Sequence, residues 1–188
     1  MRSRRDVRQV LFIQGAGEGA HDEWDATLVA SLDEARRATD DLRYPRMPNE
    51  EDPSSGRWGA AIRREIASLA DGAVVIGHSV GGTLLVQTLI SGTHQQRLAG
   101  IVLISAPFVG LGGWPGDDFE FSADLGARLP QDVPVQVFHG LDDRTVPPSH
   151  ARLYGDAIAR AQVYLLPGRD HQLNTDLREV AAALDTFQ

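Results

Sequence analysis

Short apolar runs that alternate with amphipathic stretches restrict the folds open to this chain more than any other feature. Continuous runs of this length, rich in Val, Ile and Leu, are typical of strands buried on both faces of a sheet. The expected strands are residues 7–13, 42–44, 73–77, 101–105, 135–139 and 163–166. With helices between them, the pattern predicts an α/β protein, a three-layer α/β/α sandwich around a mostly parallel sheet of about six strands.

The stretches between these runs carry apolar residues at helical spacing, which predicts helices at residues 23–37, 57–70, 83–90, 149–160 and 175–186. The first helix has four residues on its expected inner face: Trp24, Leu28, Leu32 and Ala35. The second has four as well: Trp58, Ile62, Ile66 and Leu69. Ser54 or Ser55 stands where a side chain can cap the start of the second helix.

The length and composition fit one globular domain, because 188 residues that are 42% hydrophobic can bury a substantial core. The least regular segment is residues 107–134, which is rich in glycine and aromatic residues and is a candidate for a loop over a site. It is too short for a cap domain. Its aromatic residues either line a shallow apolar cleft or cover the sheet edge: Phe108, Trp114, Phe119 and Phe121.

The charged and sulfur-containing residues exclude several classes of function. A net charge of −8 argues against a nucleic-acid partner, because phosphate binding needs clustered cations. The chain has no lysine, so a Walker-type phosphate loop, a Schiff-base cofactor and a Ser–Lys dyad are excluded. It has no cysteine, which excludes a thiolate nucleophile and Cys-ligated zinc. No apolar run is long enough for a membrane span or a signal-peptide core, and we expect a cytoplasmic location.

The segment Gly77-His78-Ser79-Val80-Gly81 fits the G-x-S-x-G pattern of a nucleophile elbow, between an expected strand and an expected helix. In such an elbow the serine lies on a tight, strained turn, so close packing requires small residues at Gly77 and Gly81. The turn raises the Ser79 hydroxyl above the sheet and directs the Val80 N–H at the same space. A glycine-rich turn without a catalytic role is the alternative interpretation.

A serine hydroxyl needs a base, and His171 is the histidine in the most suitable place. It follows the last expected strand, on the polar loop VYLLPGRDHQLN, whereas His78 beside the serine is expected to point away. A third partner should orient the imidazole and stabilise its cation. Asp142 and Asp143 follow the fifth expected strand and are candidates for it, with the capping of a turn as their alternative role.

A metal site built from His139 and the neighbouring carboxylates competes with this interpretation, but the spacing of a zinc or two-metal site is missing, so no metal is expected. In contrast, Ser79, Asp143 and His171 each follow a different strand at the same edge of the predicted sheet. This order along the chain, nucleophile then acid then base, is the order expected of α/β-hydrolases.

The chain resembles the α/β-hydrolase superfamily over nearly its whole length, through GHSVG at the elbow, HGLDDRTVP at the acid turn and PGRDHQLN at the base loop. It is most similar to the small, capless serine hydrolases of the retinoblastoma-binding-protein-9 type. The resemblance implies one α/β-hydrolase domain over residues 1–188 without a cap, and an acyl-serine intermediate. It also selects Asp143 over Asp142, because the acid in that pattern lies three residues before the valine of VP. Two residues depart from the pattern: Gln14 replaces a usual histidine, and Asp170 a common glycine.

The opening loop FIQGAGEGA has a second interpretation, because Gly15, Gly17 and Ala20 fit the dinucleotide fingerprint G-x-G-x-x-G/A. A phosphate loop should run straight into a helix, whereas here the helix is expected to begin only some residues later. The second expected strand also ends without the acid of a Rossmann fold. The loop is therefore expected to supply the Ala16 N–H, which with the Val80 N–H would form an oxyanion hole.

Together these residues predict a serine hydrolase that cleaves a carboxylic ester, thioester or related small acyl compound without a cofactor. The expected partner is thus a small-molecule acyl substrate, and the sequence indicates no particular oligomeric state. Two alternatives stay open. One is a binding protein that keeps the hydrolase fold but has weak or no activity, and the other is the nicotinamide- or flavin-binding oxidoreductase that the opening loop suggests.

Overall fold

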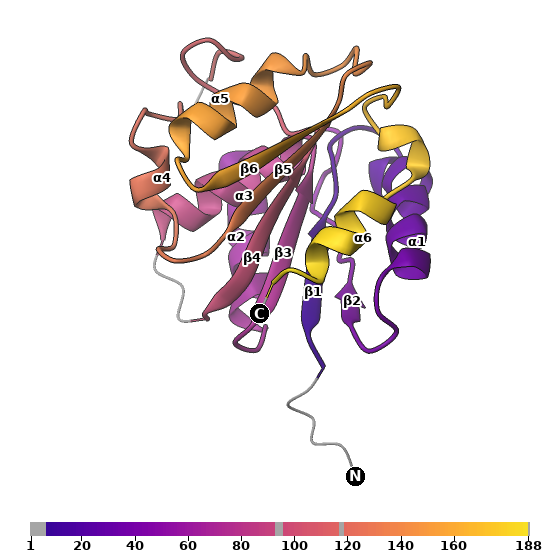
Figure 1. The fold of residues 1–188 in the computed structure, drawn as a ribbon. Helices are drawn as coiled ribbons and strands as arrows, with labels where there is room; N and C mark the ends of the chain where they lie inside the picture. The colour runs from indigo at the N-terminus through magenta and orange to yellow at the C-terminus, as the bar shows by residue number, and fades with distance from the viewer. Residues whose placement is uncertain (1–6, 93–95, 117–118, 188) are drawn as a thin grey trace.

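A six-stranded sheet forms the centre of the computed structural model, which describes residues 7–92, 96–116 and 119–187 (Figure 1). The strand order is β2-β1-β3-β4-β5-β6, and every neighbouring pair is parallel. The strands are β1 (Gln9–Ile13), β2 (Asp41–Arg43), β3 (Ala73–His78), β4 (Leu98–Ile104), β5 (Val135–Gly140) and β6 (Ala161–Leu166). Because the strands are parallel, their carboxyl ends lie at one edge of the sheet.

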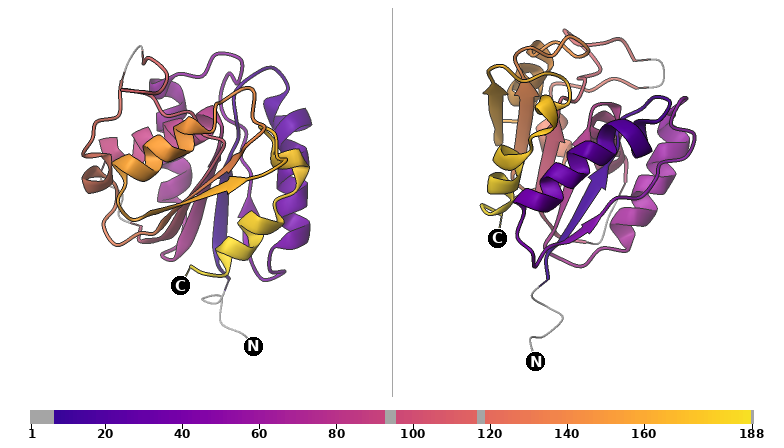
Figure 2. Two further views of the ribbon diagram at one scale, coloured as in Figure 1. Left: turned by 45° about the horizontal axis from the view of Figure 1, so that its top comes forward. Right: turned by 90° about the vertical axis from the view of Figure 1, so that its right-hand side faces the viewer.

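Helices cover both faces of the sheet, as the views in Figure 2 show. One face carries α1 (Asp25–Ala35) and α6 (Arg178–Leu184), and the other carries α2 (Ser55–Ala67), α3 (Val80–Ser91), the short α4 (Leu125–Arg128) and α5 (Ser149–Ala157). Each face has its own apolar core, and the strands contribute to both. The expected three-layer α/β/α sandwich is therefore confirmed, and the described residues form no cap domain over it.

Helix α2 shows how local sequence produces this packing. The Ser54 hydroxyl accepts a hydrogen bond from the Arg57 N–H, so Ser54 is the N-cap of the two candidates. Trp58 and Ile62 are fully buried against the sheet, and the Trp58 Nε1–H donates to the Pro48 carbonyl at 2.8 Å. The expected inner face of this helix is thus confirmed.

The inner face expected for the first helix is wrong at both ends. Trp24 is 57% exposed, Ala35 is exposed, and Asp25 takes the inward position ahead of Leu28. At the N-terminal end the reason is a π-helical turn, Ala20–Trp24, that precedes α1, whereas Ala35 is the last residue of the helix. A π-turn holds more residues than an α-turn, so it rotates the side chains before Asp25 away from the face that α1 buries.

The last strand is less buried than its apolar sequence predicts. Along the first four residues of β6, partly buried and exposed side chains alternate, and the last two residues are partly buried. β6 pairs only with β5, so it forms an edge of the sheet, and Tyr164 is 38% exposed. The helix expected over residues 175–186 also begins later, at Arg178, because a short helical turn, Leu173–Thr175, precedes it.

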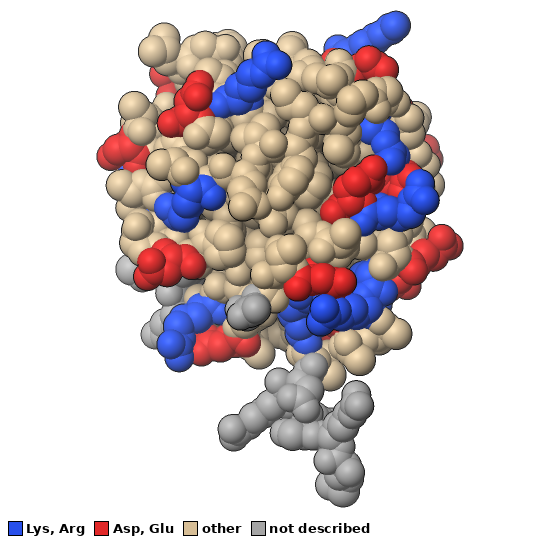
Figure 3. Space-filling model, in the orientation of Figure 1, with Lys and Arg blue, Asp and Glu red and all other residues tan. Residues whose placement is uncertain are grey.

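Charged side chains are dispersed over the face shown in Figure 3, where arginines lie among aspartates and glutamates rather than in a patch of one sign. Within the described ranges, no helix has both the length and the apolar character needed to cross a membrane.

Candidate active site

The turn between β3 and α3 has the geometry of a strained elbow. Ser79 has a φ of 51° and a ψ of −132°, a conformation that a residue with a side chain rarely adopts. The glycines on either side allow close packing. A Cβ on Gly81 would lie 2.0 Å from the Gln14 carbonyl oxygen, and one on Gly77 would lie 2.4 Å from the Gly82 Cα. The turn therefore needs the small residues that the sequence pattern predicts at both positions.

The structure brings together three predicted residues at the carboxyl ends of β3, β5 and β6. The Ser79 Oγ lies 3.0 Å from the His171 Nε2, and the His171 Nδ1 lies 2.8 Å from the Asp143 Oδ2. Asp143 is buried, whereas the side chain of the other candidate, Asp142, is exposed. This chain of contacts permits proton transfer from the hydroxyl to the imidazole while the carboxylate holds the opposite ring nitrogen.

The Asp143 carboxylate is held from several directions. Its Oδ1 accepts from the N–H groups of Thr145 and Val146, both at 2.8 Å, and its Oδ2 also lies 3.1 Å from the His139 Nε2. Burial alone would raise the pKa of Asp143, but hydrogen bonds from His139, His171 and Val146 outweigh it and hold the pKa well below its usual range. Asp143 therefore stays ionised at neutral pH.

His139 supports this carboxylate through its Nε2. Its Nε2 faces Asp143 and the Val146 carbonyl, both acceptors, while its Nδ1 is buried with no partner in the described part of the chain. The proton therefore belongs on Nε2. Across the residues that the structure describes, no group of three or more His, Cys, Asp or Glu side chains is arranged to hold a metal ion.

The opening loop places its amides around the elbow. The Gly15 N–H donates to the Asp25 carboxylate at 2.6 Å, and the Gly17 N–H donates to the Glu50 carbonyl at 2.7 Å. No group among the described residues pairs with the amides of Ala16 and Val80. An aspartate already occupies the first N–H of the loop, which disfavours a dinucleotide phosphate there and leaves the two predicted oxyanion donors unpaired.

Gln14, the first departure from the family pattern, connects this loop to its neighbour. Its Nε2 donates to the Glu50 carboxylate at 2.7 Å, and its Oε1 accepts from the Met47 N–H at 2.9 Å. Glu50 also accepts from the N–H groups of Gly19 and His21. Partial burial raises the pKa of Glu50, but the hydrogen bonds lower it by a larger amount, so the net pKa is lowered and the group stays charged. Gln14 thus fixes the loop without using the Ala16 N–H.

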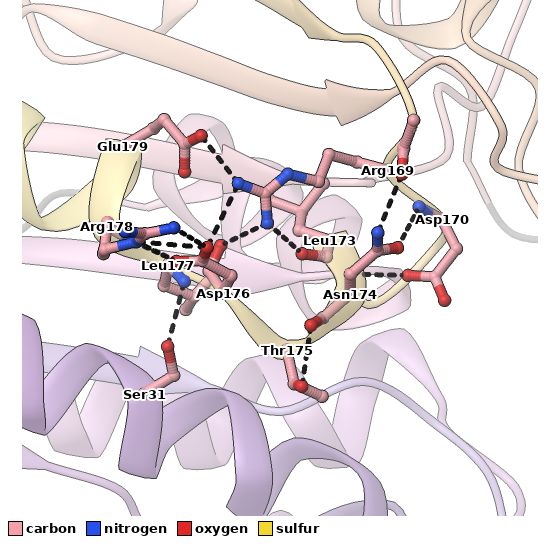
Figure 4. A network of polar contacts seen from close by, with 11 residues as sticks. Ser31, Arg169, Asp170, Leu173, Asn174, Thr175, Asp176, Leu177, Arg178 and Glu179 are labelled. Atoms are coloured by element: carbon pink, nitrogen blue, oxygen red, sulfur yellow. Dashed lines mark hydrogen bonds and ion pairs between the residues drawn. The ribbon is translucent and has the colours of Figure 1, made fainter.

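Asp170, the second departure, shapes the loop that carries His171 (Figure 4). After His171 and Gln172, the residues Leu173, Asn174 and Thr175 have φ values of 49°, 54° and 53°, so the backbone makes a left-handed turn. The Asp170 Oδ1 accepts from the N–H groups of Gln172 and Asn174, and the Asn174 side chain binds back to the Asp170 N–H at 3.0 Å. These hydrogen bonds stabilise a backbone conformation that is costly for residues other than glycine.

Arg169 also holds the loop that carries His171. Its guanidinium donates to the Leu173 carbonyl at 2.9 Å, to Asp176 at 3.2 Å and to Glu179 at 2.8 Å, as the dashed lines in Figure 4 show. Asp176 also accepts from Arg178, whose hydrogen bonds are the main reason that the pKa of Asp176 is lowered. Polar contacts at the surface thus fix the loop, together with the burial of Leu173 in the apolar core.

A buried pair that the sequence analysis misses lies behind the nucleophile. The His78 Nδ1 lies 2.9 Å from the Asp25 Oδ2, and its Nε2 lies 3.2 Å from the His171 carbonyl oxygen. Each of the two residues is only 1% exposed. Asp25 sits at the start of α1, far from the elbow in sequence, and no local motif marks it.

A groove of about 510 Å³ opens beside the elbow, with Val80, Thr83 and Leu84 contributing from α3. One wall comes from residues 52–55, at the start of α2, and the other from the loop after β4. Of the four aromatic residues considered above, Trp114 and Phe119 line the groove. Phe108 and Phe121 are each only 5% exposed and pack in the core, so the loop both lines a cleft and covers the sheet.

Comparison with protein families gives one match, to the family described as Serine hydrolase, over residues 10–176. A search of curated proteins finds no match.

Solved structures with the same fold include the ydeN gene product of Bacillus subtilis, with a TM-score of 0.75 and 21% identity over 96% of this chain and 98% of that one. The esterase RhEst1 from Rhodococcus sp. ECU1013 has a TM-score of 0.74 and 17% identity over 97% and 92% of the two chains. Est1E from Butyrivibrio proteoclasticus has a TM-score of 0.67 and 14% identity over 95% and 85%. These likenesses show the α/β-hydrolase fold, and the narrower resemblance to the retinoblastoma-binding-protein-9 type stays a prediction.

Proposed function

The chain belongs to the serine hydrolase family, and from that premise we propose that it cleaves a carboxylic ester or thioester of a small acyl group through an acyl-serine intermediate. The observation that carries the proposal is the chain of contacts from Ser79 through His171 to Asp143, with distances of 3.0 and 2.8 Å. Both distances lie within the reach that nucleophilic catalysis requires.

The proposed reaction begins when the Ser79 Oγ attacks the substrate carbonyl carbon and the His171 Nε2 takes the hydroxyl proton. The carbonyl oxygen becomes an oxyanion, which the unpaired N–H groups of Ala16 and Val80 would stabilise. Collapse of this intermediate expels the alcohol or thiol, to which His171 gives the proton. Water then attacks the acyl-serine in the same manner and releases the acid. Asp143 keeps the imidazole in its working tautomer throughout.

The groove beside Val80 supports a small acyl substrate. Its side toward α3 and the loop after β4 carries Leu84, Trp114 and Phe119, whereas polar residues, among them Asp52 and Ser54, line the opposite side. Apolar side chains next to the nucleophile favour an acyl or alkyl group over a charged one. One structural neighbour is described as an esterase, which supports an ester as the bond that is cleaved.

The experiment that tests the proposal compares the parent with Ser79→Ala on short p-nitrophenyl esters and thioesters, and includes labelling by a fluorophosphonate probe. We expect the parent to hydrolyse esters and to be labelled, and Ser79→Ala to lose both properties. Hydrolysis by Ser79→Ala at the parent rate would overturn the mechanism. A parent that is folded but neither labelled nor active would instead support the alternative of a hydrolase-fold binding protein.

Two further expectations stay predictions. Limited proteolysis would test whether residues 1–188 form a single domain, and cell fractionation would test the cytoplasmic location.

A further inference from the structure

The proposed mechanism leaves unused a buried ionisable pair directly beneath the nucleophile. His78 is the last residue of β3, immediately before Ser79, and Asp25 is the first residue of α1. A buried histidine and a buried aspartate are costly unless each has a partner, so the contacts that they make are informative.

The protonation of His78 follows from what its two ring nitrogens face. The Nδ1 faces the Asp25 carboxylate at 2.9 Å, and the Nε2 faces the His171 carbonyl oxygen at 3.2 Å. Both groups are acceptors, and a neutral imidazole has only one N–H to donate. When Asp25 is ionised, as its lowered pKa indicates, the geometry is satisfied only if both nitrogens carry protons, which makes the ring an imidazolium.

Asp25 is placed to balance that charge. Its carboxylate also accepts from the Gly15 N–H at 2.6 Å. Burial works against the charged form of each residue, but their mutual attraction outweighs it. The pKa of His78 is consequently raised and the pKa of Asp25 is lowered.

The pair has a distinct contact at each end. The imidazolium holds the backbone of His171, the proposed base, and the carboxylate holds the loop that presents the Ala16 N–H. We propose that His78 and Asp25 are positioning residues, an imidazolium–carboxylate pair that fixes the base loop and the oxyanion loop relative to Ser79. This inference rests on the proposed function.

The pair should give the enzyme an alkaline limit. Loss of a proton from His78 leaves one nitrogen lone pair facing an acceptor, so either the His171 carbonyl or Asp25 loses its hydrogen bond. The ionisable groups that act on this pair are Asp143 and His171 from the adjoining loops, and Tyr44 beside Asp25. Below the raised pKa of His78 the pair is intact, and above it the two loops are released.

The test measures kcat/KM for p-nitrophenyl acetate against pH in the parent, His78→Gln and Asp25→Asn. The parent should lose activity at alkaline pH. His78→Gln should lack this alkaline limb and have kcat/KM lower by about a hundredfold, the effect of a misplacement on the order of 1 Å. Asp25→Asn should move the limb to lower pH, because His78 loses the charge that favours its proton.

A matched control removes a buried carboxylate elsewhere. Asp40 is 6% exposed and pairs with Arg8 at 2.5 Å, just before β2 and thus at the opposite edge of the sheet. Asp40→Asn should lower the melting temperature but leave the shape of the pH profile unchanged. If His78→Gln and Asp25→Asn also keep the parent profile and lose activity only in proportion to stability, the proposal is wrong.

A second measurement does not need turnover. Nitrogen-15 histidine NMR identifies the His78 signals as those that are missing from His78→Gln. In the parent at pH 7.5, both ring nitrogens of His78 should carry protons. A singly protonated ring would overturn the inference even in a fully active enzyme. Conversely, a parent that hydrolyses nothing while His78 is doubly protonated would contradict the proposed function and leave the pair itself established.

Discussion

The two loops that carry the proposed nucleophile and base are held by different kinds of interaction. The elbow around Ser79 is buried, and close backbone contacts at Gly77 and Gly81 fix it. The loop around His171 lies at the surface, and hydrogen bonds and ion pairs from Arg169 and Asp170 fix it. The elbow thus depends on the absence of side chains at two positions, and the base loop depends on specific polar side chains in addition to the buried Leu173.

This difference indicates how each half should fail. A steric clash in the elbow cannot be relieved without moving β1 or β3, so damage there should destabilise the whole protein. A lost polar contact in the base loop should leave the sheet intact and move His171 away from Ser79. Stability should therefore report on the elbow, and activity at constant stability should report on the base loop.

The largest effect is expected where the base loop meets the acid. Asp143→Asn should lower kcat by about a thousandfold to ten-thousandfold, because an amide cannot stabilise the imidazolium and favours the wrong tautomer. Asp142→Asn is the matched control, since the Asp142 side chain is exposed, and it should retain nearly all activity. Steady-state kinetics on a p-nitrophenyl ester measure both. Equal losses in the two variants would contradict the assignment of the acid to Asp143.

The second prediction tests the elbow. In Gly81→Ala the new Cβ would lie 2.0 Å from the Gln14 carbonyl oxygen. We expect a destabilisation of about 3 kcal/mol or more, at the upper end of overpacking effects because the obstacle is backbone. The melting temperature should fall by about 10 °C.

The control for that variant is Gly56→Ala, at an exposed position of α2 where nothing lies within 4 Å of an added Cβ. It should stabilise the protein by about 0.5 kcal/mol, because alanine is the better helix former. Thermal unfolding followed by circular dichroism compares the two variants. A similar melting temperature for Gly81→Ala and the parent would show that the elbow has room that the structure does not indicate.

The third prediction tests the base loop. Arg169→Ala removes the donors to Leu173, Asp176 and Glu179, and we expect kcat/KM to fall by about tenfold with little change in melting temperature. Arg178→Ala is the control, because Arg178 also binds Asp176 but is 77% exposed. It should change kcat/KM by about twofold or less. If Arg169→Ala instead unfolds the protein with activity unchanged per folded molecule, the contrast between the two loops fails.

The smallest effect on the site is expected when the pH is lowered. The pKa values of Asp143 and Asp176 are lowered in the folded protein, so their stabilising contribution is complete above the ordinary aspartate pKa of about 3.9 and is lost as the pH falls below it. The base loop, which both carboxylates support, should open first. Hydrogen exchange as the pH is lowered from 5 to about 2 should show loss of protection for the Leu173 N–H before the Gly82 N–H, after correction for intrinsic rates. The reverse order would remove the distinction between the loops.

The sequence predicts the elbow well because its causes are local. β3 enters the turn as a continuous apolar run, and Gly77 and Gly81 are required by contacts that any such turn would make. The positions of Asp143 and His171 follow from the same reasoning, since residues after parallel strands meet at one edge. The expected fold is confirmed for this reason, whereas the catalytic roles stay predictions.

Features that depend on distant partners are the ones that sequence reasoning misses. Trp24 has the spacing of a buried residue, but a π-turn rotates it into solvent, and no local pattern reveals that turn. The pairing of Asp25 with His78 joins α1 to the end of β3, which only the assembled fold brings together. Similarly, Gln14 and Asp170 look like defects in a motif until their partners are known.

The parallel arrangement of the sheet also determines how this site comes into existence. No two neighbouring strands of the described sheet form a hairpin, because each pair is parallel and each connection crosses over. Folding must therefore close long loops before any strand pairing is gained, which favours slow folding relative to helical bundles of the same size. The hydroxyl of Ser79 meets the imidazole of His171 only when β5 and β6 have joined the sheet, so we expect a partly folded chain that lacks these strands to carry no activated serine.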